Sequence, residues 1–265
     1  MAHDSIRVVQ ISDIHLFADK HAALLGVKTE ESFQVIIDML HKQSPRPDFI
    51  ILSGDLTQDF SEATYRRLAE KLRTLSLPIY CIPGNHDDPK VMARVYPLDT
   101  ILADKHIVKN NWHIILLDSH KPGAVEGYLH PSQLDFMQAC LKQYPEHHAI
   151  VVFHHQPFSV GCAWLDNLGL KNADEFWAIL MQYPQVRAVL FGHVHQEHNK
   201  KHLGMQCYSA PSTCIQFKKH SDNFALEKLP PGYRWLELFS NGAIQTQVFR
   251  ADHYVGTFDV NAKGY

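Results

Sequence analysis

Five short polar motifs in this chain combine the residue types that bind metal ions and transfer protons. Each motif comes directly after an apolar run that is typical of a β-strand. The motifs are Asp13-Ile14-His15, Gly54-Asp55, Gly84-Asn85-His86-Asp87, His154-His155 and Gly192-His193-Val194-His195. A sheet that delivers oxygen and imidazole ligands from the ends of its strands would bring these motifs together. The pattern therefore predicts a metal-dependent active site.

The donor atoms of the motifs indicate which ions they bind. Oxygen and imidazole ligands without thiolate favour divalent Mn, Fe, Zn or Co. There are too many ligands for one structural ion, whereas two ions about 3.5–4 Å apart would use them all in phosphoryl transfer. Because residues i and i+2 of a strand share a face, Asp13 and His15 can bind one ion together. The same spacing lets His193 and His195 address one shared site.

Each motif on its own also has a simpler interpretation. The Asp-x-His and Gly-Asp pairs are compatible with turns that follow strands. The two histidines after Gly192 are compatible with surface residues, since 19 of the 265 residues are histidine. A shared site is favoured because such motifs recur, in this order, at the ends of five strands. Within that site, His86 can serve as an acid or as a hydrogen-bond donor to phosphate.

Composition narrows the class of protein. Hydrophobic residues make up 45% and charged residues 20%, and the formal net charge is −3. This balance is typical of soluble globular proteins and provides no bulk attraction to nucleic acid or to an anionic membrane. The sequence shows no signal peptide and no membrane-spanning run. Five cysteines without CxxC spacing favour buried, reduced thiols. We therefore expect a cytoplasmic protein without nucleic-acid or membrane partners; composition is compatible with a monomer or homodimer and does not choose between them.

The order of the expected elements indicates an α/β fold. Apolar runs predict five strands, with the sequences IRVVQIS, FIILSG, IYCIPG, AIVVF and RAVLFG. Helical spacing and capping residues predict helices over 30–43, 61–75 and 132–143 and after Asn172. This alternation predicts a largely parallel sheet in one domain over 1–265. Two later segments, 205–217 and 233–249, look like antiparallel strands, with a hairpin turn at Asn241-Gly242. They suggest a second sheet that closes against the first.

The motif series DxH, GD, GNHD, HH and GHVH resembles the calcineurin-like metallophosphoesterase family. That resemblance implies a four-layer α/β/β/α sandwich with two mixed sheets. Longer segments resemble the bacterial class III 3′,5′-cyclic AMP phosphodiesterases; they are LFADKHAALLGV, HHQPFSVGCAWLD, GHVHQE and APSTCIQFKKHSDNF. The implied activity is hydrolysis of 3′,5′-cyclic AMP to 5′-AMP. The alternatives are a phosphodiesterase for 2′,3′-cyclic nucleotides or glycerophosphodiesters, and a catalytically silent scaffold protein.

The resemblance also implies a role for each motif residue. It assigns Asp13, His15 and His195 to a first metal ion, Asn85, His154 and His193 to a second, and Asp55 to both. The ions would be Fe²⁺ and/or Mn²⁺, with Zn²⁺ or Co²⁺ as alternatives. A hydroxide bridging them would attack phosphorus, with Asp55 and His86 as catalytic residues and His86 protonating the leaving sugar oxygen. The implied substrate-binding residues are His15, Asn85, His86, His154 and His195.

Two further observations qualify this assignment. Many family members carry GDxxD, whose second acid orients the motif histidine, but here the run is GDLTQD, with Gln58 at the acidic place. This departure leaves open which group orients His86 and argues against a phosphoprotein phosphatase. Trp164, Phe158 and Tyr128 can stack on a purine, although packing is the simpler interpretation. His155 is assigned to packing or to support of a ligand.

Overall fold

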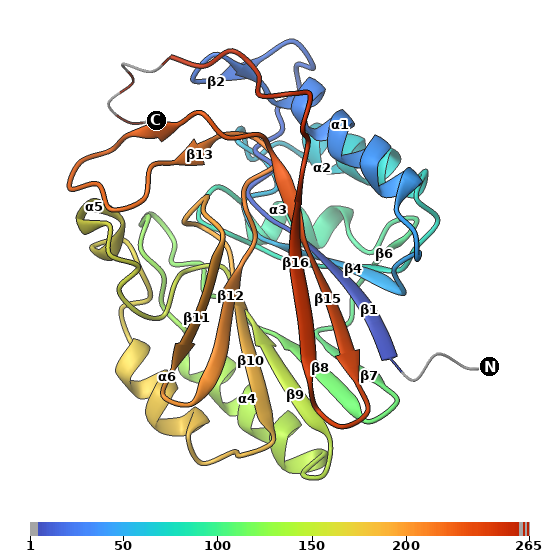
Figure 1. Cartoon of the computed structure of the whole chain (residues 1–265), viewed down its shortest axis with the longest axis vertical. Helices are drawn as coiled ribbons and strands as arrows, with labels where there is room; N and C mark the ends of the chain where they lie inside the picture. Colours follow the sequence, from blue (N-terminus) through green and yellow to red (C-terminus); the bar gives the residue numbers. More distant parts are fainter. Residues whose placement is uncertain (1–4, 260–261, 263, 265) are drawn as a thin grey trace.

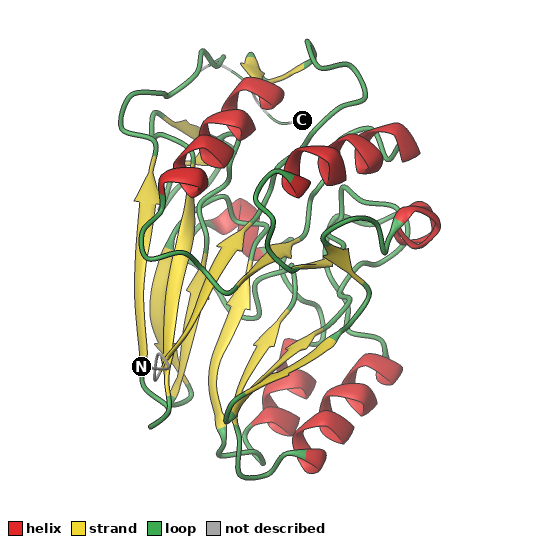
Figure 2. Ribbon diagram, turned by 90° about the vertical axis from the view of Figure 1, so that its right-hand side faces the viewer, coloured by secondary structure: helices red, strands yellow, loops and turns green. Residues whose placement is uncertain are grey.

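Two mixed β-sheets of six strands each lie at the centre of the structure, which is a computed structural model that describes residues 5–259, 262 and 264. The first sheet has the order β16-β15-β1-β4-β5-β6 and the second the order β11-β12-β10-β9-β8-β7. Figure 2 shows the two sheets in yellow between groups of helices. The first sheet consists of β1 (Ser5–Ile11), β4 (Phe49–Ser53), β5 (Ile79–Ile82), β6 (Ile101–Leu102), β15 (Gly232–Phe239) and β16 (Ile244–Arg250). The second consists of β7 (His106–Lys109), β8 (Trp112–Leu116), β9 (His148–Val152), β10 (Val186–Phe191), β11 (His198–His202) and β12 (Met205–Ser209).

The remaining elements cover these sheets or connect their strands. Figure 1 shows α1 and α2 beside the first sheet and α4 and α6 beside the second. The helices are α1 (Thr29–Lys42), α2 (Glu62–Arg73), α3 (Pro89–Val95), α4 (Pro131–Gln143), α5 (Ala163–Asp166) and α6 (Ala173–Leu180). Two short ribbons complete the fold, formed by β2 (Ala23–Leu24) with β3 (Val27–Lys28) and by β13 (Gln216–Phe217) with β14 (Leu226–Glu227).

Three apolar cores correspond to the three interfaces between layers. The odd-numbered residues Val9 and Ile11 of β1 pack with α1 and α2, whereas the even-numbered Ile6 and Val8 face the second sheet. In β9, Val151 packs with α4 and α6. Its neighbours Ile150 and Val152 belong to the core between the sheets. Alternation of strand side chains therefore builds helix, sheet, sheet and helix layers. This confirms the predicted four-layer α/β/β/α sandwich.

The predicted helices and strands occur close to their expected positions. Helix α2 begins after Ser61, whose side chain accepts a hydrogen bond from the backbone N–H of Thr64, as expected of a capping serine. The parallel pairs β1–β4, β4–β5, β8–β9 and β9–β10 confirm the parallel character of the early strands. Among the described residues, no helix is both long and apolar enough to cross a membrane.

The late strands differ from the prediction in where they lie. Hairpin β15–β16 forms at the expected turn, with Gly242 at φ 84°, but it joins the first sheet through β1. Strand β12 is antiparallel to β11 and parallel to β10, so it extends the second sheet. The late strands are thus added to both sheets and do not build the second one. Four of the strands of the second sheet are β7, β8, β9 and β10. Strands β7 and β8 form a hairpin that was not predicted, with its turn at Asn110 (φ 51°).

Candidate metal centre

Most of the motif residues lie in tight loops directly beyond the ends of strands. Strand β1 ends at Ile11 and β10 ends at Phe191. Five motif residues there and after β4 have left-handed backbone conformations; they are Asp13 (φ 54°), His15 (φ 51°), Asp55 (φ 53°), His193 (φ 68°) and His195 (φ 46°). The i, i+2 geometry of a regular strand therefore does not apply to these pairs. Left-handed residues other than glycine are uncommon and cluster at functional sites, where the surrounding fold holds them.

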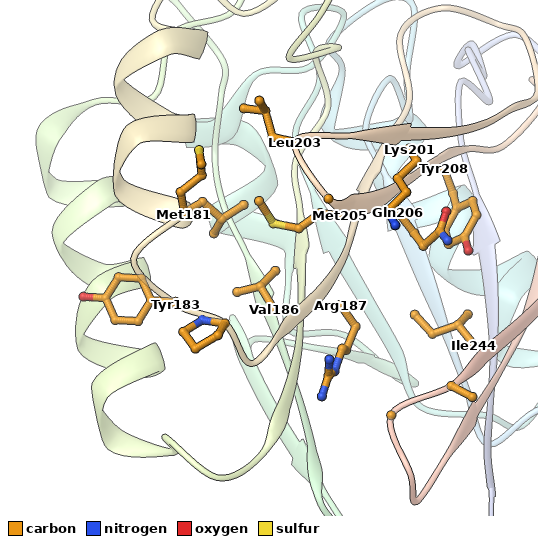
Figure 3. A pocket seen from close by; sticks show the side chains of 15 residues that line it. Met181, Tyr183, Val186, Arg187, Lys201, Leu203, Met205, Gln206, Tyr208 and Ile244 are labelled. Carbon is orange, nitrogen blue, oxygen red and sulfur yellow. The ribbon is translucent and has the colours of Figure 1, made fainter.

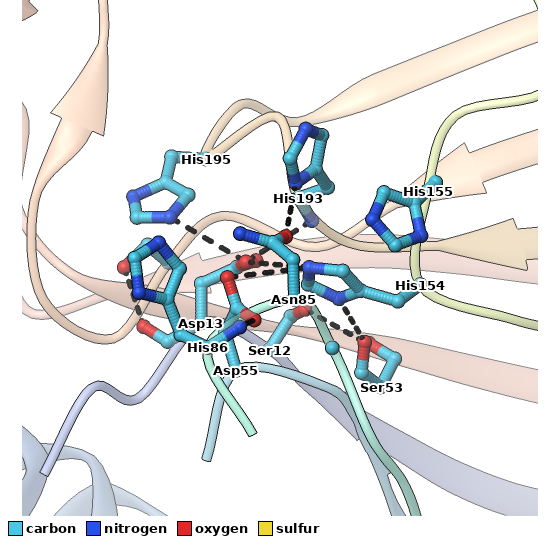
Figure 4. Close-up of polar contacts among 12 residues, drawn as sticks. Ser12, Asp13, Ser53, Asp55, Asn85, His86, His154, His155, His193 and His195 are labelled. Carbon is cyan, nitrogen blue, oxygen red and sulfur yellow. Dashed lines mark hydrogen bonds and ion pairs between the residues drawn. The ribbon is translucent and has the colours of Figure 1, made fainter. Parts of the chain in front are cut away.

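The first group of candidate ligands consists of Asp13, His15, Asp55 and His195. All four are buried, and one ligand atom from each lies within 4.8 Å of the others. The Nε2 of His195 is 3.4 Å from Asp13 Oδ1, and the Nε2 of His15 is 3.6 Å from Asp55 Oδ2. The chain therefore gathers two carboxylates and two imidazoles from three different loops. Figure 4 shows Asp13, Asp55 and His195 of this group.

The second group lies on the other side of Asp55 and contains His154, His193 and Asn85. The Nε2 of His154 is 3.2 Å from Asp55 Oδ2, and the Nδ1 of His193 is 2.9 Å from Asn85 Oδ1. The ring of His155 is also close, but its Nδ1 contacts the Ser119 hydroxyl at 2.8 Å and its Nε2 contacts the Val125 carbonyl at 3.0 Å. Because both of its nitrogens have partners, His155 is suited to support rather than to ligation.

Asp55 is the residue that belongs to both groups. Its Oδ2 lies 3.6 Å from His15 Nε2 and 3.2 Å from His154 Nε2. Its other oxygen, Oδ1, accepts a hydrogen bond of 2.8 Å from the backbone N–H of His86. Gly54 allows this crowding, since a Cβ on it would lie 2.3 Å from His154 Nδ1. The carboxylate of Asp55 thus contacts one histidine of each ligand group.

Hydrogen bonds to backbone carbonyls orient the imidazoles towards this centre. The Nδ1 of His195 donates to the Ile215 carbonyl at 2.9 Å, and the Nδ1 of His154 donates to the Ser53 carbonyl at 2.8 Å. In a neutral ring this leaves the lone pair on Nε2, the atom that faces the carboxylates. The Nε2 atoms of His15 and His195 are only 3.1 Å apart. Two lone pairs at this distance repel each other unless a cation lies between them.

The pKa values in the centre agree with the chemistry of a cation site. Burial lowers the pKa of His15 to about 4 and holds that of His195 well below its ordinary value, so both rings are neutral ligands. Burial also disfavours a charge on His154, but the carboxylates of Asp55 and Asp13 outweigh it and raise its pKa to about 9. Asp13 Oδ2 is buried and has no hydrogen-bond partner among the described residues. The donors, their charges and this vacant acceptor fit divalent metal ions.

Gln58 and Asp87 hold the motif loops in place. Neither residue was assigned a functional role from the sequence. The Oε1 of Gln58 lies 2.6 Å from His15 Nδ1, so the residue at the usual acidic place orients His15. The buried carboxylate of Asp87 accepts from the backbone N–H groups of Leu56 and Gly84 and from the Tyr65 hydroxyl, at 2.9–3.0 Å. Asp87 thereby joins the Gly-Asp loop to its own loop. Its position inside GNHD was the only available signal.

His86 lies at the open side of the centre. Its ring is 5.1 Å from the ring of His15 in an edge-on arrangement. Together with Asn85 and His193 it lines a pocket of about 240 Å³. We name this hollow the side pocket; its apolar wall consists of Val125, Trp164, Leu165, Leu168, Phe217 and Phe224, and Gly264 near the C-terminus also lines it. His86 therefore stands between the metal ligands and an apolar hollow, where it can reach a bound phosphate ester.

The three aromatic residues noted in the sequence have different surroundings. Trp164 lines the side pocket. Phe158 packs against Phe191 and stacks on His202, and Tyr128 is 38% exposed; neither lines the side pocket. A larger cavity of about 450 Å³ is shown in Figure 3. It is lined by Val186 and Arg187 at the start of β10, whereas the metal-binding motif follows the end of that strand.

Comparisons with known proteins agree with this geometry. The family described as calcineurin-like phosphoesterase matches residues 6–197. The 3′,5′-cyclic adenosine monophosphate phosphodiesterase CpdA of Vibrio vulnificus is 40% identical, covering 100% of this chain and 97% of its own. The protein of the same name from Pseudomonas aeruginosa is 38% identical, covering 98% and 96%. A dimetal phosphatase from Danio rerio has a similar fold, with a TM-score of 0.65 and 14% identity over 93% of this chain and 99% of its own.

The family match includes all five polar motifs, from Asp13 to His195. The relatives extend the similarity over the whole length of the chain. Together with the four layers and the two ligand groups, these matches identify the protein as a member of the calcineurin-like phosphoesterase family.

Proposed function

We propose that the protein hydrolyses 3′,5′-cyclic AMP to 5′-AMP at a two-metal centre. The observation that carries the proposal is the position of Asp55, whose carboxylate contacts a histidine of each ligand group. The names of the full-length relatives support the choice of substrate, since they are phosphodiesterases for this nucleotide. The reaction adds water to phosphorus and breaks the bond to the 3′ oxygen of the ribose.

The residues that would hold the metals follow from the two groups. We assign Asp13, His15 and His195 to the first ion, Asn85, His154 and His193 to the second, and Asp55 to both. Fe²⁺ and Mn²⁺ are the proposed ions, with Zn²⁺ or Co²⁺ as alternatives, because the donors are oxygen and imidazole. Bound ions of this kind would lower the pKa of water and neutralise phosphate charge.

The chain's own residues supply orientation and a proton. His86, on the open side of the centre, would donate a proton to the leaving 3′ oxygen. Asn85 and His86 would also contact the phosphate, together with the metal-binding histidines His15, His154 and His195. Asp87 holds the loop of His86 against the loop of Asp55 through backbone hydrogen bonds. The proton donor and the shared ligand are thereby kept at a fixed spacing.

A substrate panel tests the proposal. Purified enzyme with Mn²⁺ or Fe²⁺ is given 3′,5′-cyclic AMP, 3′,5′-cyclic GMP, 2′,3′-cyclic AMP, glycerophosphodiesters, bis-p-nitrophenyl phosphate and 5′-AMP. We expect the highest kcat/KM for 3′,5′-cyclic AMP, no release of phosphate from 5′-AMP, and loss of turnover with a chelator. Equal turnover of all diesters would indicate a broad phosphodiesterase instead. Metal binding without any turnover would indicate a silent scaffold.

The cellular setting of the proposal is the cytoplasm. All five cysteines are buried and unpaired, which suits a reducing compartment. A cyclic nucleotide is the proposed partner, and neither nucleic acid nor membrane is required by the reaction. The enzyme would lower the concentration of cyclic AMP in the cell.

A further inference from the structure

We infer that the side pocket receives the purine base of the nucleotide and that Trp164 is the residue that contacts it. The inference rests on the proposed function, since a base subsite has meaning only for a nucleotide substrate. It adds a specificity-determining residue outside the metal motifs and outside the phosphate-binding residues.

Continuity with the metal centre is the first argument. Asn85, His86 and His193 form one side of the side pocket, and the apolar wall forms the other. A cyclic nucleotide carries its phosphate and its base on the same ribose. When the phosphate lies beside His86, the base must therefore occupy a hollow that adjoins His86. The cavity in Figure 3 does not meet this condition, because it lies at the other end of β10.

The chemistry of the wall is the second argument. Trp164, Phe217 and Phe224 form a cluster with ring centroids 4.9, 5.1 and 5.5 Å apart. Leu165 and Leu168 extend this apolar surface. Aromatic side chains bind nucleobases by stacking, because every base presents a π-face. A volume of about 240 Å³ lies below the roughly 300–1,000 Å³ of complete ligand sites. It suits one part of a ligand.

A polar group on Trp164 is the third argument. Its indole N–H is buried and has no hydrogen-bond acceptor among the described residues. By contrast, the indole N–H groups of Trp112 and Trp177 donate to backbone carbonyls at 2.9 and 2.8 Å. A buried donor without an acceptor is costly. The ring nitrogens of a purine are acceptors, so a bound base would satisfy it.

The cluster also connects the base to the metal ligands. Phe217 stacks on His195, with centroids 4.1 Å apart and planes 13° apart, and its ring contacts Trp164 edge-on. A base bound by Trp164 would therefore be linked to His195 through Phe217, which contacts both side chains. Because of this link, Trp164 and Phe224 are safer positions for substitution than Phe217.

The test compares 3′,5′-cyclic AMP with its abasic analogue, 1-deoxyribose 3′,5′-cyclic phosphate. The measured quantity is the ratio of the two kcat/KM values. We expect Trp164→Ala to lower this ratio about 10-fold or more, since stacking on one side chain contributes that much per base. Trp164→Phe, which keeps a ring for stacking but lacks the indole N–H, should restore only part of it. Leu168→Trp should also lower the ratio of the two kcat/KM values, because the larger side chain would fill the pocket and exclude the base.

Phe158→Ala is the matched control, because Phe158 packs beside Phe191 and His202 and does not line the pocket. It should leave the ratio unchanged. Calorimetric binding of 5′-AMP and of ribose 5-phosphate provides a readout without turnover, and only the first should weaken in Trp164→Ala. Circular dichroism confirms that each variant is folded.

The outcomes separate this inference from the proposed function. If the wild type cleaves bis-p-nitrophenyl phosphate but no cyclic nucleotide, the proposed function fails. If the wild type prefers 3′,5′-cyclic AMP to the abasic analogue and folded Trp164→Ala and Leu168→Trp keep that preference, only the base subsite is wrong. A wild type that cleaves both equally also overturns the subsite, while leaving the diesterase activity intact.

Discussion

The loops of the first sheet bring oxygen ligands to the centre, and the loops of the second bring imidazoles. Asp13, Asp55 and Asn85 follow β1, β4 and β5, whereas the histidines of the second ligand set follow β9 and β10. His15 and His86 are the imidazoles on the first side. The two carboxylates and His86 therefore belong to one half, whereas His154, His193 and His195 belong to the other. Each of the two ligand groups, as proposed, draws residues from both halves.

We expect the largest effect from removal of the Asp55 carboxylate, which contacts both ligand groups. Asp55→Ala deletes the contact to His15 on one side and to His154 on the other. We expect kcat/KM to fall by about 10³-fold or more, because several kcal/mol of charge stabilisation disappear with the ligand. Steady-state kinetics measure the fall in kcat/KM, and elemental analysis measures the loss of bound metal. Asp48→Ala is the control, since Asp48 precedes the start of β4; a similar loss there would contradict the assignment.

Replacing the proton donor should affect chemistry and leave metal binding intact. His86→Ala is expected to lower kcat by about 10²-fold or more, as for loss of a general acid. Metal content should stay at the wild-type value, because His86 is not among the assigned ligands. The exposed His41 provides the control variant His41→Ala. Loss of metal from His86→Ala would instead make His86 a ligand.

Removing a supporting residue on each side sharpens the comparison further. Gln58→Ala removes the acceptor beside His15 Nδ1, and Ser119→Ala removes the hydroxyl beside His155 Nδ1. We expect Gln58→Ala to weaken metal affinity about 10–100-fold, because His15 is an assigned ligand. Ser119→Ala should have a much smaller effect. Titration with Mn²⁺ measures the affinity of both variants. An equal loss would contradict the smaller role expected of Ser119, whose hydroxyl also accepts from the backbone N–H of His154 at 3.3 Å.

Stability tests whether the two halves depend on each other. Ile51 in β4 and Ile150 in β9 are both buried in the core between the sheets. Ile51→Val and Ile150→Val should each lower the free energy of unfolding by about 1 kcal/mol. Urea unfolding should remain a single transition in both variants, because they share one core. Two separate transitions, each shifted by only one variant, would show that the halves unfold independently.

A smaller, pH-dependent effect belongs to the second sheet alone. Burial, with His106 and His147 nearby, lowers the pKa of His113 in β8 to about 4. The unfolded ring has an ordinary pKa of about 6.5, so protonation favours unfolding as the pH falls from 6.5 towards 4. His113→Gln should lose about 1 kcal/mol less stability over that interval than the wild type, allowing for screening by solvent. Urea unfolding measures this difference. If the wild type and His113→Gln lose the same free energy of unfolding between pH 6.5 and 4, His113 does not cause the pH dependence.

The sequence predicted the fold well where signals are local. Apolar runs predicted β1, β4, β5, β9 and β10, and the capping serine predicted the start of α2. The sheet that hairpin β15–β16 joins was not predictable from local signals, since its partner β1 lies near the other end of the chain. Strand β12 pairs with the nearby β10 and β11, but the apolar pattern alone did not indicate this pairing. The turn at Asn110 carried a local signal, two consecutive asparagines, that the strand patterns did not use. The single-domain assignment over 1–265 stays a prediction.

The candidate site was predictable as a set of residues but not as a geometry. The resemblance to the family placed Asp13, Asp55 and His195 in one group without any knowledge of the backbone. Their left-handed conformations could not be predicted from residue type. Aspartate and histidine adopt this conformation more often than most other residues, but still only in a small minority of cases. The contact between Gln58 and His15 was equally unpredictable from the sequence. A family pattern indicates an acid at that place, and only coordinates show that the glutamine reaches His15.

The hydrogen bond from the His193 backbone to Asp13 Oδ1 joins residues 180 positions apart. Such a contact closes a very long loop, so we expect it to form late during folding. A nascent chain that has not yet produced β10 has no means of completing either ligand group. Catalytic competence is thus a property of the finished chain, and metal uptake is expected to report the last steps of maturation. Ions that bind only the completed centre then also stabilise it against partial unfolding.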